Sequence, residues 1–141
     1  MQIIDVVAAI LVRDGQVLLA QRSPDCDQPG LWEFPGGKVE PGESQPAALA
    51  RELAEELAIS AHIGAYVASH TREVSGRVIR LHAWQVNDFD GEPQALCHSA
   101  LVWCEPREAF GEAFGYALAP ADIPLLEAFM SARDATPADL C

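Results

Sequence analysis

The chain has 141 residues, 50% of them hydrophobic, and its 21 acidic residues against nine lysines and arginines give a net charge of −12. This length is enough to bury the core of one domain, so we expect residues 1–141 to form a single domain. The charge argues against a nucleic-acid polymer as partner, because such partners are usually met by a basic patch. A small polyphosphate would also be repelled unless metal cations stood between it and the acidic side chains.

The composition also predicts a cytoplasmic protein. No segment approaches the ~18 consecutive apolar residues of a transmembrane helix, and the N-terminus lacks the basic start of a signal peptide, so no membrane contact is expected. The four cysteines show no close paired spacing, and we expect reduced thiols: Cys26, Cys97, Cys104 and Cys141. We expect a monomer or a weak homodimer.

The first part of the chain predicts a β-hairpin. Residues 3–12 form an almost continuous apolar run, residues 13–16 (RDGQ) contain an Asp-Gly turn, and residues 17–21 return as a strand. Residues 31–34 read as a further short strand, which a Pro-Gly-Gly loop at residues 35–37 ends.

A helix is predicted over about residues 45–57. Ser44 is a suitable N-cap, and Pro46 is tolerated in the first turn. A leucine recurs every four residues and predicts the buried face of this helix: Leu49, Leu53 and Leu57.

The second half of the chain predicts another hairpin and a short strand. Strands over about residues 63–74 and 77–86 flank Ser75-Gly76, a compact turn signal. Residues 88–91 read as a turn, and residues 100–104 as a strand.

The C-terminal part predicts helices. A brief helical stretch follows Pro106, a final helix spans about residues 123–133, and residues 134–141 are expected to fray. Mixed strands with helices outside them predict an α/β (α+β) sandwich.

The helix over residues 45–57 carries three glutamates on one side. At 100° per residue Glu52, Glu55 and Glu56 fall within an arc roughly 100° wide, where each like-charged pair costs about a few tenths of a kcal/mol. Arg51 can relieve Glu55 at i+4. A solvated acidic face is the alternative, but such faces usually alternate with lysine, and this helix contains none.

Directly before this helix lies a glycine-bearing loop. Glycine lets the backbone approach a ligand, so a carbonyl near Gly37 can point at a metal ion. Glu43 stands at the far end of the loop. The loop and the acidic helix together predict a divalent-metal site for a phosphate substrate.

The same residues carry a family resemblance. Gly37, five residues, Glu43, seven residues and then residues 51–59 (RELAEELAI) resemble the Nudix box, and residues 33–38 (EFPGGK) resemble its MutT-type subgroup. The family usually has glycine where this chain has Ala58. That glycine serves the exit of the helix, so we expect a small backbone adjustment there.

The resemblance implies the Nudix fold, a mixed β-sheet between helices, and metal-dependent hydrolysis of a nucleoside diphosphate linked to another group. Further stretches resemble a bacterial branch that cleaves cytidine and 5-substituted deoxycytidine triphosphates: residues 66–70, 72–77, 81–84 and 118–124. Two alternatives are a purine-directed pool-sanitising diphosphatase of the 8-oxo-dGTP type and a nucleotide-binding regulator that has lost catalysis.

The resemblance also implies roles for the motif residues. Mg²⁺, with Mn²⁺ as a substitute, would be held by the Gly37 carbonyl, Glu52, Glu55 and Glu56. Glu52 is the first choice for general base. Glu43 is expected to orient Arg51 or an outer-sphere water.

One expected acid is missing. MutT-like enzymes can supply an additional loop acid near the position of Cys97-His98, where this chain has none, and Glu92 is the nearest carboxylate. The missing loop acid makes Glu52 the more strongly favoured candidate for the general base. His98 could stand in, although a lone exposed histidine usually has no such role.

Asp122 is a candidate for recognising the base. Cytosine presents an N4 amino donor, from which a carboxylate can accept. Asp122 lies in a stiff segment between Pro120 and Pro124, where it could instead cap the final helix. Both interpretations stay open, and one residue could do both.

Two arginines are candidates for phosphate or base contacts. If Ser75-Gly76 is a two-residue turn, Arg72 and Arg77 project from the same face of the hairpin. Their planar side chains suit phosphate and base acceptors. The alternative is a solvent-facing pair bonded to Glu73 or Glu92.

Three further candidates flank the glycine loop. Glu33 is opposite in phase to its aromatic neighbours and could contact base or ribose, whereas Arg22 and Lys38 are weaker phosphate candidates. The three tryptophans are expected in the core.

Overall fold

Strand β1 (Gln2–Arg13) is the central strand of the sheet in the computed structural model, which describes residues 2–25, 29–109 and 118–140. It pairs in parallel with β7 (Arg77–Val86) and antiparallel with β4 (Gly36–Lys38) and β2 (Gln16–Gln21). The seven-stranded sheet follows the order β3-β2-β1-β7-β6, with β4 beside β1 and β9 beside β2. The predicted mixed sheet is therefore confirmed.

The other elements complete this sheet or cover it. They are, in chain order, β3 (Trp32–Glu33), α1 (Gln45–Leu57), β5 (Ser60–His62), β6 (Tyr66–Val74), β8 (Asp88–Asp90), β9 (Ala100–Cys104), η1 (Pro106–Ala109), η3 (Pro120–Asp122) and α2 (Ile123–Leu140). Strands β5 and β8 form a separate two-stranded sheet. In the described part of the chain, no helix is both long and apolar enough to cross a membrane.

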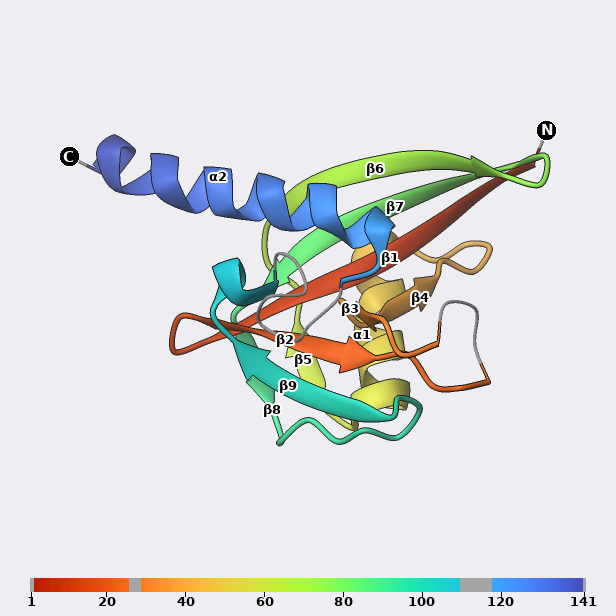
Figure 1. Ribbon diagram of the computed structural model, residues 1–141, viewed down its shortest axis with the longest axis horizontal. Helices are drawn as coiled ribbons and strands as arrows, with labels where there is room; N and C mark the ends of the chain where they lie inside the picture. Colours follow the sequence, from red (N-terminus) through yellow and green to blue (C-terminus); the bar gives the residue numbers. More distant parts are fainter. Residues whose placement is uncertain (1, 26–28, 110–117, 141) are drawn as a thin grey trace.

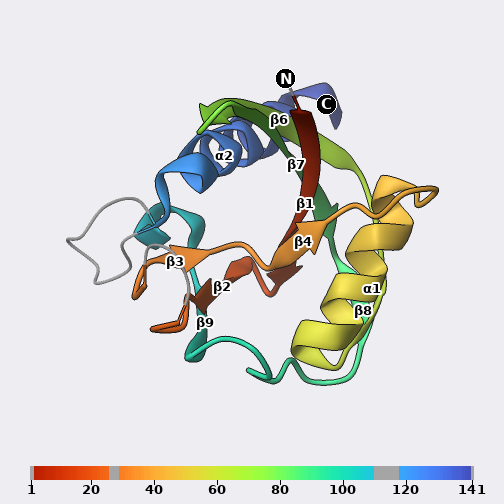
Figure 2. The ribbon, with the colours of Figure 1, turned by 90° about the vertical axis from the view of Figure 1, so that its right-hand side faces the viewer.

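The two helices cover opposite faces of the sheet (Figures 1 and 2). Successive side chains of a strand point to opposite faces, so β1 supplies both layers of the core. Val7 and Ala9 pack with Leu53 of α1, whereas Ile10 packs with Phe129 of α2. The tryptophans pack against these clusters, as expected.

Helix α1 begins and ends as its sequence predicts. The Ser44 hydroxyl accepts a hydrogen bond from the Ala47 amide at 3.2 Å, and the helix ends at Leu57. Ala58 follows in the left-handed conformation with φ 59° and ψ 35°, and its N–H donates to the Ala54 carbonyl. This conformation costs an L-residue roughly 1–2 kcal/mol, which glycine avoids. The helix therefore ends in the conformation that glycine would adopt at position 58, with local strain in the backbone of Ala58.

The glycine loop before α1 is partly a strand, which corrects one expectation. Gly36 pairs with Ala8 and Gly37 with Val7, because the edge of β1 has open hydrogen-bonding groups there. Gly36 leaves no room for a side chain, since a Cβ would lie 1.9 Å from the Val7 carbonyl oxygen.

Other boundaries also differ from the sequence prediction. The strand expected from residue 63 begins at Tyr66. Residues 60–62 form strand β5, which pairs with β8 at residues 88–90. A turn was expected at residues 88–91. This pairing joins segments almost 30 residues apart in the sequence, so local patterns do not show it. Helix α2 continues to Leu140, whereas residues 134–141 were expected to fray.

Candidate active site

A cavity of about 420 Å³ lies beside β1, β3 and β4 and reaches one glutamate of α1. Apolar side chains such as Val6, Phe34 and Leu81 form part of its wall. Its charged and titratable lining side chains are Arg22, Glu33, Glu56, His70, Arg72, Cys97, His98 and Asp122. Helix α1 and the segment that precedes α2 therefore contribute to one site.

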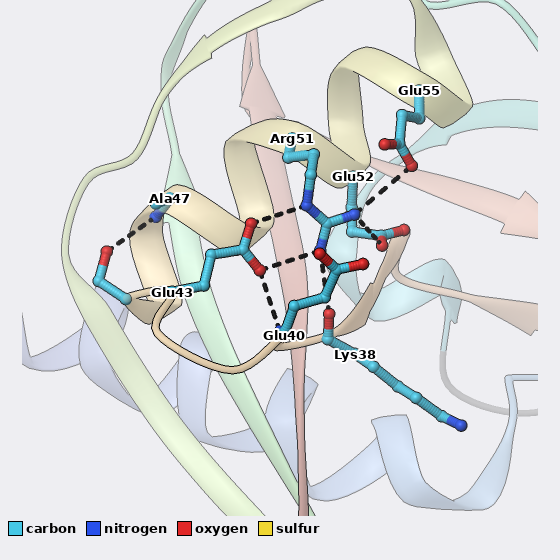
Figure 3. Close-up of polar contacts among 8 residues, drawn as sticks. Lys38, Glu40, Glu43, Ala47, Arg51, Glu52 and Glu55 are labelled. Atoms are coloured by element: carbon cyan, nitrogen blue, oxygen red, sulfur yellow. Dashed lines mark hydrogen bonds and ion pairs between the residues drawn. The ribbon is translucent and has the colours of Figure 1, made fainter.

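Beside the cavity, Arg51 gathers the acidic residues of the Nudix box (Figure 3). Its Nε and Nη2 donate to the two carboxylate oxygens of Glu43 at 2.7 and 3.0 Å, and its Nη1 donates to Glu52 Oε1 at 2.8 Å. Nη1 also lies 3.5 Å from Glu55 Oε2, and Nη2 donates to the Lys38 carbonyl. One guanidinium thus fixes both the loop and the first catalytic candidate of the helix.

The charge pairing is strong at Glu43. The hydrogen bonds from Arg51, and then one from the Glu40 amide, lower the pKa of Glu43 to about 2. Glu43 and Glu52 in turn raise the pKa of Arg51. Glu43 is therefore an anion at any working pH, and both of its carboxylate oxygens accept hydrogen bonds from Arg51.

Gly37 lies directly against Glu52. A Cβ at this position would lie 2.4 Å from Cδ and Oε2 of the Glu52 side chain. The absent side chain thus allows the Glu52 carboxylate to lie against the β4 backbone.

Glu56 is the glutamate of α1 that lines the cavity. Burial raises its pKa to about 7, and the negative charges of Glu52 and Glu33 add to this, while His98 and the Gly36 N–H oppose it. Its Oε1 is buried without a hydrogen-bond partner among the described residues. The surroundings of Glu56 therefore disfavour its anionic form, and nearby positive charge would stabilise that form.

Glu33 is held by two other side chains that line the cavity, Arg22 and His98. Arg22 Nη1 donates to its Oε1, and His98 Nε2 lies 3.0 Å from its Oε2. Burial alone would raise the pKa of Glu33, but the hydrogen bonds and charges of His98 and Arg22 lower it. The His98 side chain is 6% exposed, so the expectation of an exposed histidine was wrong.

Asp122 is buried at the start of α2, with 5% of its surface exposed. The Phe34 backbone N–H donates to its carboxyl group. Burial, aided by the negative charge of Glu33, raises the pKa of Asp122 well above its usual range. Its surroundings therefore favour the uncharged form of the side chain, whereas those of Glu33 favour the ionised form.

The hairpin register agrees with the prediction, but only one of its arginines reaches the cavity. Arg72 pairs with Ile79 and Val74 with Arg77, and Arg72 lines the cavity wall. Arg77 is exposed at the end of the hairpin and is not part of the lining. The alternative partner Glu92 pairs with Arg13 instead, at 2.9 Å.

Lys38 and Glu92 both lie outside the cavity lining. The Lys38 side chain is exposed and extends away from the acidic cluster (Figure 3). Glu92, the nearest loop acid in the sequence, does not line the cavity.

His70, which lines the cavity, was not predicted, although the alternation along β6 places it on the same face as Arg72. Cys97 is an exposed free thiol and Cys104 a buried one, whereas Cys26 and Cys141 lie outside the described residues.

The acidic residues fit a divalent cation, although they do not enclose one in this conformation. Within residues 2–25, 29–109 and 118–132, no three His, Cys, Asp or Glu side chains form a group that could hold a metal ion. Glu52 and Glu55 turn instead toward Arg51. The buried unpaired oxygen of Glu56 and the Gly37 backbone against Glu52 are features that a bound cation would satisfy.

Comparisons with known proteins agree with this geometry. The NUDIX domain family model matches residues 2–129. The chain is 66% identical over 139 residues, 99% of its length and 100% of the relative's, to the CTP pyrophosphohydrolase of Escherichia coli strain K12. It is 39% identical over 105 residues to the 8-oxo-dGTP diphosphatase of Haemophilus influenzae, which covers 74% of this chain and 77% of that one.

Solved structures give the same result. The solution structure of the E. coli ORF135 protein matches with a TM-score of 0.88 at 66% identity, covering 98% of this chain and 96% of that one. The MutT NUDIX hydrolase of Burkholderia pseudomallei matches with a TM-score of 0.79 at 28% identity, covering 91% and 98%. The chain therefore belongs to the Nudix hydrolase family.

Proposed function

We propose that this protein is a magnesium-dependent nucleoside triphosphate pyrophosphohydrolase that cleaves CTP, dCTP and 5-substituted dCTP to the monophosphate and pyrophosphate. The observation that carries the proposal is one cavity whose lining includes Glu56 of the Nudix box together with Glu33 and Asp122. The E. coli CTP pyrophosphohydrolase, at 66% identity over nearly the whole chain, supports the choice of cytosine nucleotides.

The glutamates of α1, together with Gly37, are the proposed site of the reaction. Glu52, Glu55, Glu56 and the Gly37 carbonyl would hold the cation. A bound Mg²⁺ would neutralise phosphate charge and make the attacking water more acidic, and the attack would fall on the β-phosphorus with the monophosphate as leaving group. Glu52 takes the proton of the attacking water, and Arg51 holds its carboxylate in place through Oε1.

Glu52→Gln tests this assignment. The amide keeps the size of the side chain but cannot act as a base, so turnover should fall by orders of magnitude while nucleotide binding is largely kept. Near-normal turnover would remove Glu52 as the general base.

Asp122 and Glu33 are the proposed site of base recognition. An uncharged carboxyl group both donates and accepts, so Asp122 can donate to cytosine N3 while it accepts from the N4 amino group. Ionised Glu33 only accepts, which suits an amino group and disfavours a carbonyl oxygen at the same place. Arg72 is proposed to contact the phosphates or the base. Arg22 holds Glu33, whereas Lys38 and Arg77 are exposed and lie outside the cavity lining, so they are the weakest candidates for a phosphate contact.

A purine-directed 8-oxo-dGTP diphosphatase is the second candidate, because the Haemophilus influenzae relative carries that name at 39% identity. We also propose, on the nature of the substrate, a cytoplasmic enzyme that acts as a monomer or weak homodimer and limits mutagenic nucleotides.

Rates of pyrophosphate release from CTP, dCTP, 5-methyl-dCTP and 8-oxo-dGTP with Mg²⁺ test the function. Cytosine nucleotides should react fastest, and Asp122→Leu, which removes both the donor and the acceptor, should reduce the preference for them, whereas Asp122→Asn offers the same donor and acceptor and should keep it. A purine preference that survives Asp122→Leu would favour the second candidate. Release from none of them would leave only a nucleotide-binding regulator.

A further inference from the structure

In the described strands β1, β4, β6 and β7, the sheet face that borders the cavity carries no acidic side chain. Val6, Leu81 and His70 line the cavity in one cross-strand row, so side chains in phase with them share this face. The acids of these four strands, Asp5 and Glu73, have the opposite phase. The chain as a whole has 21 acids against nine lysines and arginines, so this sheet face differs in charge from the protein around it.

Three cations share the acid-free face. Lys38 pairs with Val6, and Arg72 and Arg77 are diagonal neighbours in the β6–β7 hairpin, roughly 7–8 Å apart. All three side chains are exposed, and none forms an ion pair with another described residue. Two positive charges this close repel each other unless an anion lies near them. The face therefore favours the approach of a negatively charged molecule.

The three cations extend from the cavity wall to the surface beyond it. Arg72 lines the cavity, whereas Lys38 and Arg77 lie outside the lining. Arg77 stands at the free end of the β6–β7 hairpin, next to the start of β1 (Figure 1). Lys38 extends away from the acidic cluster around Arg51 (Figure 3). The charged strand side chains along this approach to the cavity are therefore all positive.

We propose that Lys38, Arg72 and Arg77 form a capture surface, which attracts the polyphosphate of the nucleotide before it enters the cavity. This inference rests on the proposed function. A chain of net charge −12 repels a polyanion, and a local concentration of positive charge at the entrance offsets the repulsion and raises the association rate. In the bound state the phosphates lie at the glutamates of α1 with the cation, so Lys38 and Arg77 have little effect on the dissociation rate.

The competing explanation is that Arg77 contacts the bound nucleotide directly. A contact needs the planar guanidinium and acts mainly on the dissociation rate, whereas capture needs only a positive charge and acts on the association rate. Arg77→Gln removes the charge, and Arg77→Lys keeps the charge without the planar group. Arg80→Gln is the matched control, because Arg80 is exposed on the same strand but has the opposite phase.

Stopped-flow binding of a fluorescent, non-hydrolysable α,β-methylene analogue of CTP, with Mg²⁺, measures both rates. At about 0.01 M salt, Arg77→Gln should lower the association rate constant by about two- to fivefold and keep the dissociation rate constant. Lys38→Gln should behave in the same way. Arg77→Lys should bind as the wild type does, and Arg80→Gln should lose less than half as much as Arg77→Gln. At about 1 M salt, where the Debye length is about 3 Å, the variants and the wild type should associate equally fast.

Equal association rates in Arg77→Gln and Arg80→Gln at low salt would overturn the proposal. A loss that appears only in the dissociation rate, or that Arg77→Lys shares, would also overturn it in favour of a direct contact.

A change on the neighbouring strand gives an independent test. Gln2 pairs with Arg77 on the same face and is exposed, so Gln2→Glu places an acid on this face without removing an arginine. It should lower the association rate constant at low salt by about as much as Arg77→Gln, and wild-type association would overturn the proposal. A wild type that releases no pyrophosphate from any nucleotide would instead contradict the proposed function itself.

Discussion

Arg51 joins Glu43 to Glu52, with its Nε 2.7 Å from Glu43 Oε2 and its Nη1 2.8 Å from Glu52 Oε1. The acidic loop residue thereby fixes the orientation of an arginine, and that arginine fixes the carboxylate proposed as general base. These contacts explain why helix α1, which is otherwise acidic, contains an arginine at position 51.

Arg51→Lys should uncouple these two glutamates. A lysine ammonium keeps the charge but cannot bind Glu43 in a bidentate manner and reach Glu52 as well. We expect kcat to fall by about 10–100-fold with a small change in KM, because the side chain acts on the position of Glu52 rather than on the nucleotide. Steady-state kinetics measure this, with Arg107→Lys on the surface as control. An unchanged kcat would show that Glu52 needs no such support.

The two neighbouring glycines should respond differently to alanine. At Gly37 the new Cβ meets the end of the Glu52 side chain, which can turn away, so Gly37→Ala should fold but lose turnover. At Gly36 it meets the Val7 backbone, so Gly36→Ala should unfold at a clearly lower temperature. Calorimetry and kinetics on both variants check this contrast. A fully active Gly37→Ala would contradict the proposed closeness of Gly37 to the reaction.

Local patterns in the sequence predict much of this fold. The Ser44 cap, the leucine spacing and the Ser75-Gly76 turn act within a few residues, and each is present in the structure. Strands β4, β5 and β8 could not be predicted, because each is defined by a partner distant in the sequence.

The site shows the same division. The spacing within α1 indicates which glutamates lie together, but it does not show that Glu56 alone lines the cavity, or that Arg51 holds Glu52. The burial of Asp122 and His98 depends on how the chain segments before α2 and before β9 pack over β3. Sequence reasoning therefore named the residues more reliably than their surroundings.

Glu56 should make stability depend on pH in an unusual direction. Its pKa is about 7 in the folded protein against 4.5 as the ordinary value, so the folded state binds the proton more tightly than the unfolded state. The stabilisation is fully present below about pH 4.5 and is lost as the pH rises through about 7.

The comparison with Glu56→Gln isolates this effect. Without metal, the two melting temperatures should be closest near about pH 4, and Glu56→Gln should be the more stable by a growing margin toward about pH 8. Thermal unfolding across this range, in the presence of a chelator, is the measurement. A margin that shrinks with rising pH would mean that the pKa of Glu56 is not raised.

Ala58→Gly should stabilise the protein. Ala58 has a φ of 59°, and glycine removes the steric cost of this conformation, with a net gain of about 1 kcal/mol after its greater flexibility in the unfolded chain. The control is Ala54→Gly in the exposed face of α1, which should destabilise by about 1 kcal/mol. Denaturant unfolding measures both. A loss of stability in Ala58→Gly would show that the left-handed conformation carries no strain.

Product analysis of CTP hydrolysis tests the central claim most directly. Phosphorus NMR of the wild-type protein with CTP and Mg²⁺ should show CMP and pyrophosphate appearing together, with neither product formed when Mg²⁺ is removed by a chelator. The appearance of CDP and inorganic phosphate, or of no product from CTP, would contradict a pyrophosphohydrolase that acts on cytosine nucleotides.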